Sequence, residues 1–169
     1  MDALIKGGIA GLAATIPMTL AMKALRSLLP TDEQYPLPPR LIVENAAEKL
    51  GVEENRAETE KYALTLVSHF AYGAAAGAIY EQGLEIFEVE PNALNGIGYG
   101  LSVWTLSYLG LLPAARLLTP ATKHTARRNA LMIAAHIVWG ASLGSTARRL
   151  TPSRASSSLP ATPLDAYPR

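Results

Sequence analysis

The sequence has no cysteine, and this absence excludes disulfide bonds, thiolate metal sites and catalysis by a thiol. Charged residues are also scarce, at 17 % of the chain against roughly a quarter in typical soluble domains. The formal net charge of +1 provides no broad basic surface that would attract nucleic acid, so we expect no nucleic-acid partner. The length of 169 residues is enough for one domain.

Charged residues are missing altogether from four long windows, although the mean hydropathy of the whole chain is only +0.15. The windows are Gly7–Met22, Tyr62–Tyr80, Pro91–Ala115 and Asn129–Ala147. A helix needs ~20 residues to cross the hydrocarbon core of a bilayer, and a soluble helix would keep one charged face. We therefore predict an all-α integral membrane protein with four transmembrane helices, at about residues 4–28, 62–80, 94–112 and 130–147.

The first connection carries the pattern of one more helix, at about residues 39–50. Pro39 suits the first turn of a helix and Gly51 suits the position just past its end. Ile42, Val43 and Leu50 share an apolar stripe, so the segment is either an amphipathic helix that lies on the membrane or caps the bundle, or an ordinary connecting helix. We expect a transmembrane domain over residues 1–150 and a flexible Ser/Pro-rich tail over residues 151–169.

Each predicted span contains two glycines four residues apart. These pairs are Gly7 and Gly11, Gly73 and Gly77, Gly96 and Gly100, and Gly140 and Gly144. Glycines at this spacing form a flat stripe on a helix, where a second backbone can approach closely, and such packing drives association in lipid. We predict that these eight glycines lie at helix–helix contacts.

One pattern, H-x-x-[YW]-G-x-x-x-G, occurs in both the second and the fourth span. It starts at His69 and again at His136, and each histidine lies eight residues after a basic residue. The shared spacing puts each histidine on the glycine stripe, facing protein rather than lipid. It predicts an internal repeat of two helical hairpins, related by a pseudo-twofold axis along the membrane normal.

The two histidines allow three interpretations from sequence. They can form hydrogen bonds to a carbonyl or hydroxyl of a neighbouring helix, for example Thr15, Ser102 or Thr105. They can be axial ligands of haem or a chlorophyll-type macrocycle, since neutral imidazole binds haem iron. They can also sense protons in a small pH-responsive transporter or channel, in which Pro17 would be the hinge.

No set of catalytic residues can be recognised, because the sequence has no phosphate loop and no carboxylate pair inside a span. His69 and His136 have no carboxylate at helical spacing, which makes a metal site a poor interpretation. We therefore expect no enzymatic activity and no metal. The expected role is that of a scaffold, a subunit of a complex or a membrane stress factor, with the lipid bilayer, other membrane proteins or further copies of the chain as partners.

The basic residues predict an orientation. Loop 1 (30–61), loop 3 (114–129) and the adjoining helix ends hold ten Lys or Arg, against five on the other side. The positive-inside rule then places loops 1 and 3 in the cytoplasm and both termini outside.

Several of these features resemble the YagU-like family of small bacterial inner-membrane proteins. The residues concerned are Pro36-Leu-Pro-Pro-Arg40 after a Gly-rich first span, the histidine of a middle span, and His136-Ile-Val-Trp139 followed by Arg148-Arg149. The resemblance implies a location in the bacterial inner (cytoplasmic) membrane and a part in acid tolerance. It implies no catalytic residues.

Overall fold

The computed structural model describes residues 2–52 and 57–151, and these residues form helices and connections without a strand. Three helices are long and apolar enough to cross a membrane: α1 (Ala3–Arg26), α3 (Glu58–Ile86) and α6 (Ala126–Leu150). The protein is therefore all-helical and has the character of a membrane protein. Most of the predicted tail, residues 152–169, lies outside the described residues.

Helix α1 is apolar over most of its surface, as expected of a helix that meets protein on one face and lipid on the other. Its buried face includes Ala10 and Ala14, while Ile9, Ile16 and Leu20 are about half exposed or more on the outer face. The helix runs without a break through Pro17. The residue before it, Asp2, is the N-cap: its side chain accepts a hydrogen bond of 3.0 Å from the Leu4 amide and so caps the first turn.

Helices α3 and α6 extend beyond the charge-free windows that were used to predict them. Helix α3 begins four residues before and ends six residues after the predicted span at 62–80. Helix α6 begins four residues before and ends three residues after the predicted span at 130–147. The added turns carry charged residues such as Glu58 and Arg127. The helices therefore continue beyond the apolar part of the bundle.

The predicted third span is not a single α-helix. Helix α4 (Ala93–Thr105) passes into the π-helical segment η2 (Leu106–Leu111) and then into a last short turn, α5 (Leu112–Ala114). The amide of Leu112 bonds the carbonyl of Ser107, five residues back, as in a π-helix. Pro113 has no N–H to donate to Leu109, which removes one α-helical hydrogen bond here. Pro113 lies within the final turn, so the helical run continues past the predicted end of this span at residue 112.

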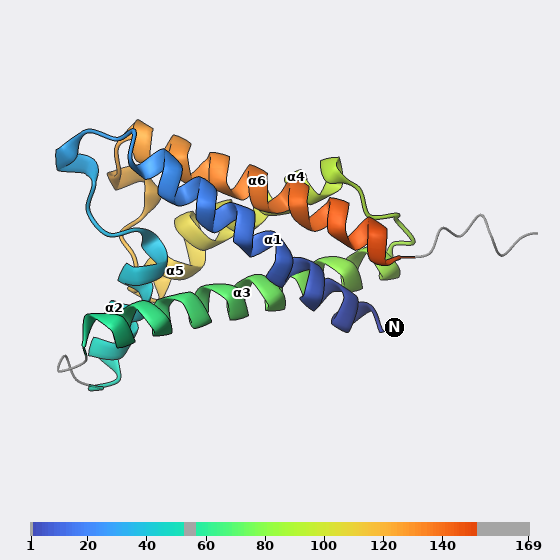
Figure 1. Cartoon of the computed structure of the whole chain (residues 1–169), viewed down its shortest axis with the longest axis horizontal. Helices are drawn as coiled ribbons and strands as arrows, with labels where there is room; N and C mark the ends of the chain where they lie inside the picture. Colours follow the sequence, from blue (N-terminus) through green and yellow to red (C-terminus); the bar gives the residue numbers. More distant parts are fainter. Residues whose placement is uncertain (1, 53–56, 152–169) are drawn as a thin grey trace, which may run out of the picture.

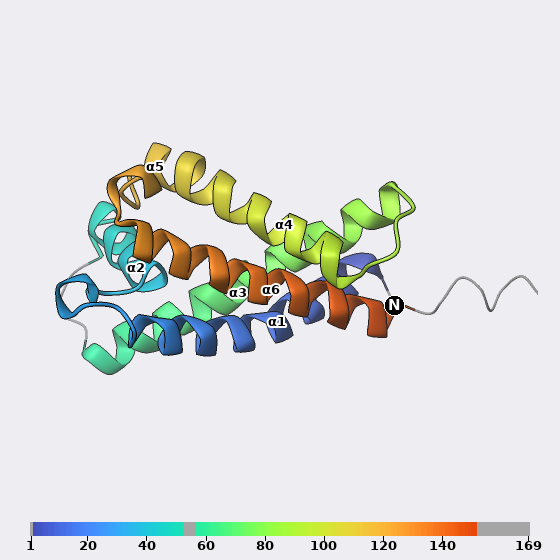
Figure 2. The same ribbon diagram turned by 90° about the horizontal axis from the view of Figure 1, so that it is seen from above.

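Helices α1 and α6 occupy the centre of the bundle, with α3 packed against α1 and α4 packed against α6. Figure 2 shows α6 between α1 and α4, and Figure 1 shows α3 on the side of α1 away from α6. Helices α3 and α4 share few contacts, because each is held by a different central helix. The N-terminus and the end of α6 lie at one end of the bundle, and loops 1 and 3 lie at the other (Figure 1).

The eight glycines lie at two helix crossings. A β-carbon built on Gly7 or Gly11 of α1 would strike the backbone of Gly77 or Gly73 of α3. A β-carbon built on Gly96 or Gly100 of α4 would strike the backbone of Gly140 or His136 of α6, and one on Gly144 would strike Asn92. By contrast, a β-carbon on Gly83, Gly98 or Gly110 would meet nothing within 4 Å.

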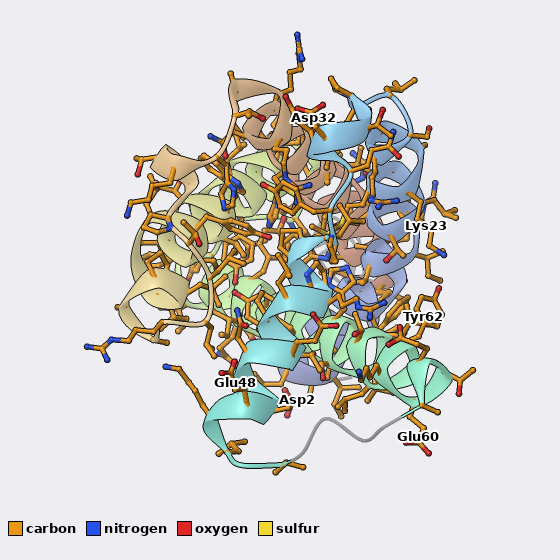
Figure 3. All side chains as sticks on the ribbon, turned by 90° about the vertical axis from the view of Figure 1, so that its left-hand side faces the viewer. Asp2, Lys23, Asp32, Glu48, Glu60 and Tyr62 are labelled. Atoms are coloured by element: carbon orange, nitrogen blue, oxygen red, sulfur yellow. The ribbon has the colours of Figure 1, made fainter. Side chains whose placement is uncertain are left out.

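A short helix, α2 (Pro38–Lys49), crosses the end of the bundle where loops 1 and 3 meet, as the view of this end in Figure 3 shows. The predicted segment was 39–50, so both the start and the end of α2 lie one residue earlier than predicted. Asn45 donates to the carbonyl of Leu117 at 2.9 Å, and Lys49 donates to that of Ala115 at 2.6 Å, so α2 is fastened to loop 3. Gly51 then leaves the helix with a φ of 64°, a conformation that favours glycine.

Two 3₁₀ turns complete the same end of the molecule, η1 (Thr31–Glu33) in loop 1 and η3 (Ala121–Lys123) in loop 3. Lys23 near the end of α1 donates to the hydroxyl of Tyr62 on α3 at 3.0 Å, and both are labelled in Figure 3. This contact joins α1 and α3 beyond the region where their glycines bring the two backbones together.

Candidate functional site

A cavity of about 280 Å³ lies between the helices at the end near α2, and it is partly open, since lining residues such as Tyr72 and Leu111 are exposed. We call it the chamber. Its lining comes from α1, α2, α3, α6 and the run from α4 to α5, and includes His69, Tyr72, Ser107, Tyr108, His136 and Trp139. Both histidines that the sequence singled out therefore face the same internal space.

The chamber exists because the helices are close at one end and apart at the other. The glycine crossings lie toward the N-terminus of α1 and the start of α4. Beyond them the inner positions are taken by larger residues, among them Met18 of α1 and Met132 of α6. Figure 1 shows α3 diverging from α1 toward the α2 end, and Pro39, Ile42 and Val43 of α2 form the chamber's outer wall.

His136 lies in the floor of the chamber, and only 5 % of its surface is exposed. Its Nδ1 is 2.7 Å from the carbonyl oxygen of Met132, one turn earlier on α6. A carbonyl can only accept, so Nδ1 carries the hydrogen, and in the neutral ring Nε2 carries the lone pair. The edge of the ring meets Tyr108, with the ring centroids 5.8 Å apart. His136 is thus oriented by its own helix and presents one acceptor nitrogen.

His69 contributes the second imidazole from α3. Its Nε2 is buried and has no hydrogen-bond partner among the described residues. A buried polar atom without a partner costs roughly 1–3 kcal/mol, so the burial of this nitrogen disfavours the folded state.

The structure corrects the expectation of interhelical hydrogen bonds from these histidines. The one hydrogen bond that the described residues give His136 stays within α6. The hydroxyls suggested as partners also bond within their own helices: Thr15 to Gly11 at 2.8 Å, Ser102 to Gly98 at 2.9 Å and Thr105 to Leu101 at 2.9 Å. Hydroxyls on helices readily bond the carbonyl one turn back, which spacing on a helical face does not reveal.

Tyrosines bridge the gap between α3 and the run from α4 to η2. The Tyr72 hydroxyl lies 3.0 Å from the Ser107 hydroxyl at the chamber, and Tyr99 donates to the carbonyl of Ala76 at 2.8 Å further along. Tyr80 donates to Asn95 near the start of α4. The two outer helices are therefore joined by side-chain hydrogen bonds rather than by close backbone packing.

Methionine is concentrated in the chamber wall, a signal that the sequence analysis did not use. Three of the chain's four methionines, Met18, Met22 and Met132, line it. Methionine is unbranched and polarizable, so it adapts to irregular shapes and is common at surfaces that accept ligands. The wall can therefore adjust to a molecule that enters the chamber.

The outer end of the chamber is fixed by a buried arginine. Arg128, at the start of α6, is 5 % exposed, and its guanidinium lies 3.4 Å from the centre of the Tyr35 ring. It donates to the carbonyls of Glu33 at 2.7 Å and Pro36 at 3.2 Å. The sequence analysis treated Arg128 only as a topology signal, whereas it holds the segment that leads into α2.

Helix α2 is further tied to α3 by an exposed ion-pair cluster. Arg40 lies 2.6 Å from the carboxylate of Glu44 and 2.8 Å from that of Glu58. The hydrogen bonds from Arg40 to Glu44 and Glu58 raise the pKa of Arg40, which is already charged at any physiological pH. Because the cluster is solvated, it adds little to stability.

Within residues 2–52 and 57–151, no group of three or more histidine or carboxylate side chains is placed to hold a metal ion. A cofactor in the chamber would meet two imidazoles, those of His69 and His136, in otherwise apolar and aromatic walls. No protein-family model, curated protein or solved structure matches the chain.

Proposed function

We propose that the chain is a four-span integral membrane protein that holds a small apolar ligand in the chamber. In this proposal the run from α4 to α5 is the additional span, and the helices form two pseudo-repeated hairpins, α1 with α3 and α4 with α6. The protein acts by binding rather than by catalysis, as a subunit, scaffold or stress factor of the membrane. We place it in the bacterial inner membrane with loops 1 and 3 in the cytoplasm.

One observation carries the proposal: both repeated histidines line one internal cavity whose remaining walls are almost entirely apolar. Small-molecule sites are typically concave and apolar with a few polar groups that fix orientation. An apolar cavity of about 150 Å³ is known to hold benzene, so about 280 Å³ suits a molecule of roughly two fused rings.

The outer surface supports the membrane setting. Large apolar side chains such as Leu20, Ile79 and Leu106 are more than 60 % exposed on α1, α3 and η2. A soluble protein rarely exposes so many large apolar residues on neighbouring elements, while lipid requires them.

Binding of naphthalene to the purified full chain in mild detergent tests the proposal. Equilibrium dialysis, corrected for partition into empty micelles, should give saturable binding of about one molecule per chain. Val103→Trp, which fills part of the chamber, should abolish saturable binding. Leu106→Trp adds the same side chain one turn away at an exposed position and should bind as the wild type does. Absence of saturable binding to the wild type, or equal binding by Val103→Trp, contradicts the proposal.

A second candidate is axial ligation of haem or a chlorophyll-type ring by His69 and His136. It is favoured by the Nδ1 bond of His136, since metal-binding histidines commonly donate their other ring nitrogen to a carbonyl. The volume counts against it, because pockets for drug-sized ligands start at roughly 300 Å³ and a tetrapyrrole is larger. An absorbance spectrum of protein purified from a cofactor-replete host decides: a strong visible band lost in His136→Leu supports this candidate, and a colourless preparation removes it.

A further inference from the structure

We propose that the ligand of the chamber is an uncharged, ring-shaped apolar molecule that carries a hydroxyl group, and that this hydroxyl donates a hydrogen bond to Nε2 of His136. The inference rests on the proposed function, because it names the chemical class of the molecule that the chamber holds. Three features of the chamber support it: the acceptor nitrogen of His136, the aromatic walls and the volume.

The acceptor nitrogen of His136 determines which polar group the ligand must carry. The hydrogen bond from Nδ1 of His136 to Met132 leaves its Nε2 as an acceptor, so a ligand group that meets it must donate. A hydroxyl is the smallest group that can donate this hydrogen bond. A carbonyl or ether oxygen can only accept, and therefore leaves Nε2 of His136 unsatisfied.

The walls define the body of the ligand. Trp139 and Tyr108 both line the chamber, and each already packs against another aromatic ring, Tyr99 at 6.1 Å and His136 at 5.8 Å between centroids. Such faces and edges favour a further ring over a flexible chain. Among the residues that the structure describes, no acidic or basic side chain other than the two histidines lines the chamber, so a charged ligand would have no ionic partner there.

Three compounds with the same two-ring body test this inference on the wild-type protein. These are 1-naphthol, which donates and accepts, 1-methoxynaphthalene, which only accepts, and 1-methylnaphthalene, which does neither. After correction for micelle partition, we expect 1-naphthol to bind roughly tenfold more tightly than 1-methylnaphthalene, in line with one hydrogen bond to a buried acceptor. 1-Methoxynaphthalene should bind only slightly more tightly than 1-methylnaphthalene.

The protein variants locate the effect. His136→Leu should remove the preference for 1-naphthol while binding of 1-methylnaphthalene remains, and His136→Gln, which keeps an acceptor, should restore part of it. If His136→Leu does not fold, the ligand series on the wild type decides alone, because it requires no variant.

The outcomes separate the inference from the proposed function. Equal affinity of the wild type for 1-naphthol and 1-methylnaphthalene overturns the inference and leaves the apolar chamber as a binding site. A preference that survives unchanged in folded His136→Leu also overturns it. Failure of 1-methylnaphthalene and 1-naphthol alike to bind saturably contradicts the proposed function itself.

Discussion

Gly96 of α4 and Gly140 of α6 face each other so closely that a β-carbon on either would strike the carbonyl oxygen of the other. The same relationship holds between Gly7 of α1 and Gly77 of α3. Two separate crossings therefore depend on the absence of a side chain. In lipid, apolar burial contributes little to helix association, so close packing of this kind favours the pairing of α1 with α3 and of α4 with α6.

Replacing Gly96 or Gly140 by isoleucine should lower stability by about 1–3 kcal/mol or more, because the new side chain would occupy space filled by backbone. Thermal unfolding in detergent measures the effect. Gly98→Ile is the matched control, since it lies on the same helix and a β-carbon there meets nothing within 4 Å. If Gly98→Ile were as destabilising as Gly96→Ile, helix propensity rather than packing would explain the loss.

Arg128 and Arg127 are neighbours in sequence with very different surroundings. Arg128→Lys should destabilise the protein by about 1–3 kcal/mol, because an ammonium group cannot reproduce both the stacking on Tyr35 and the hydrogen bonds to the carbonyls of loop 1. Arg127→Lys should change stability by less than about 1 kcal/mol, since Arg127 is largely exposed and lies 3.6 Å from Glu33. Thermal unfolding of the two variants under the same conditions measures both values. Equal effects would show that Arg128 does not hold loop 1.

Tyr72 and Ser107 join α3 to η2 beside the chamber through a hydrogen bond of 3.0 Å. A double-mutant cycle with Tyr72→Phe and Ser107→Ala should give a coupling free energy of about 0.5–1.5 kcal/mol. The cycle is its own control, because each single variant reports the other effects of its substitution. A coupling of zero would mean that the two outer helices are held together elsewhere.

The helical class and the helix positions could be predicted from the sequence, because both follow from local patterns. The predicted spans located α1, α3 and α6 to within six residues at each end. The glycine pairs are likewise a local pattern, but which helix each pair meets depends on the whole bundle. The pairing of Gly7 with Gly77 and of Gly96 with Gly140 became visible only in the structure.

The π-helical segment and the chamber could not be predicted. Segment η2 arises from a shift in hydrogen bonding before Pro113, and the apolar pattern around Leu109 is the same for an α-helix and a π-helix. The chamber depends on the distance between α3 and α4, which no periodicity encodes. Met18, Met22 and Met132 line the chamber, so their positions pointed to it. From sequence alone, however, methionine in an apolar helix usually indicates no more than a core position.

The central claim is that the run from α4 to α5 crosses the membrane as an additional span and so forms one wall of the chamber within the bilayer, with Val103 and Tyr108. Since the chain has no cysteine, single cysteines can be introduced without background. Val89 lies in the connection between α3 and α4, Thr122 lies in loop 3, and both are exposed. Labelling intact cells with a membrane-impermeant maleimide should modify Val89→Cys at once and Thr122→Cys only after permeabilisation. Modification of both from the same side would contradict the four-span account.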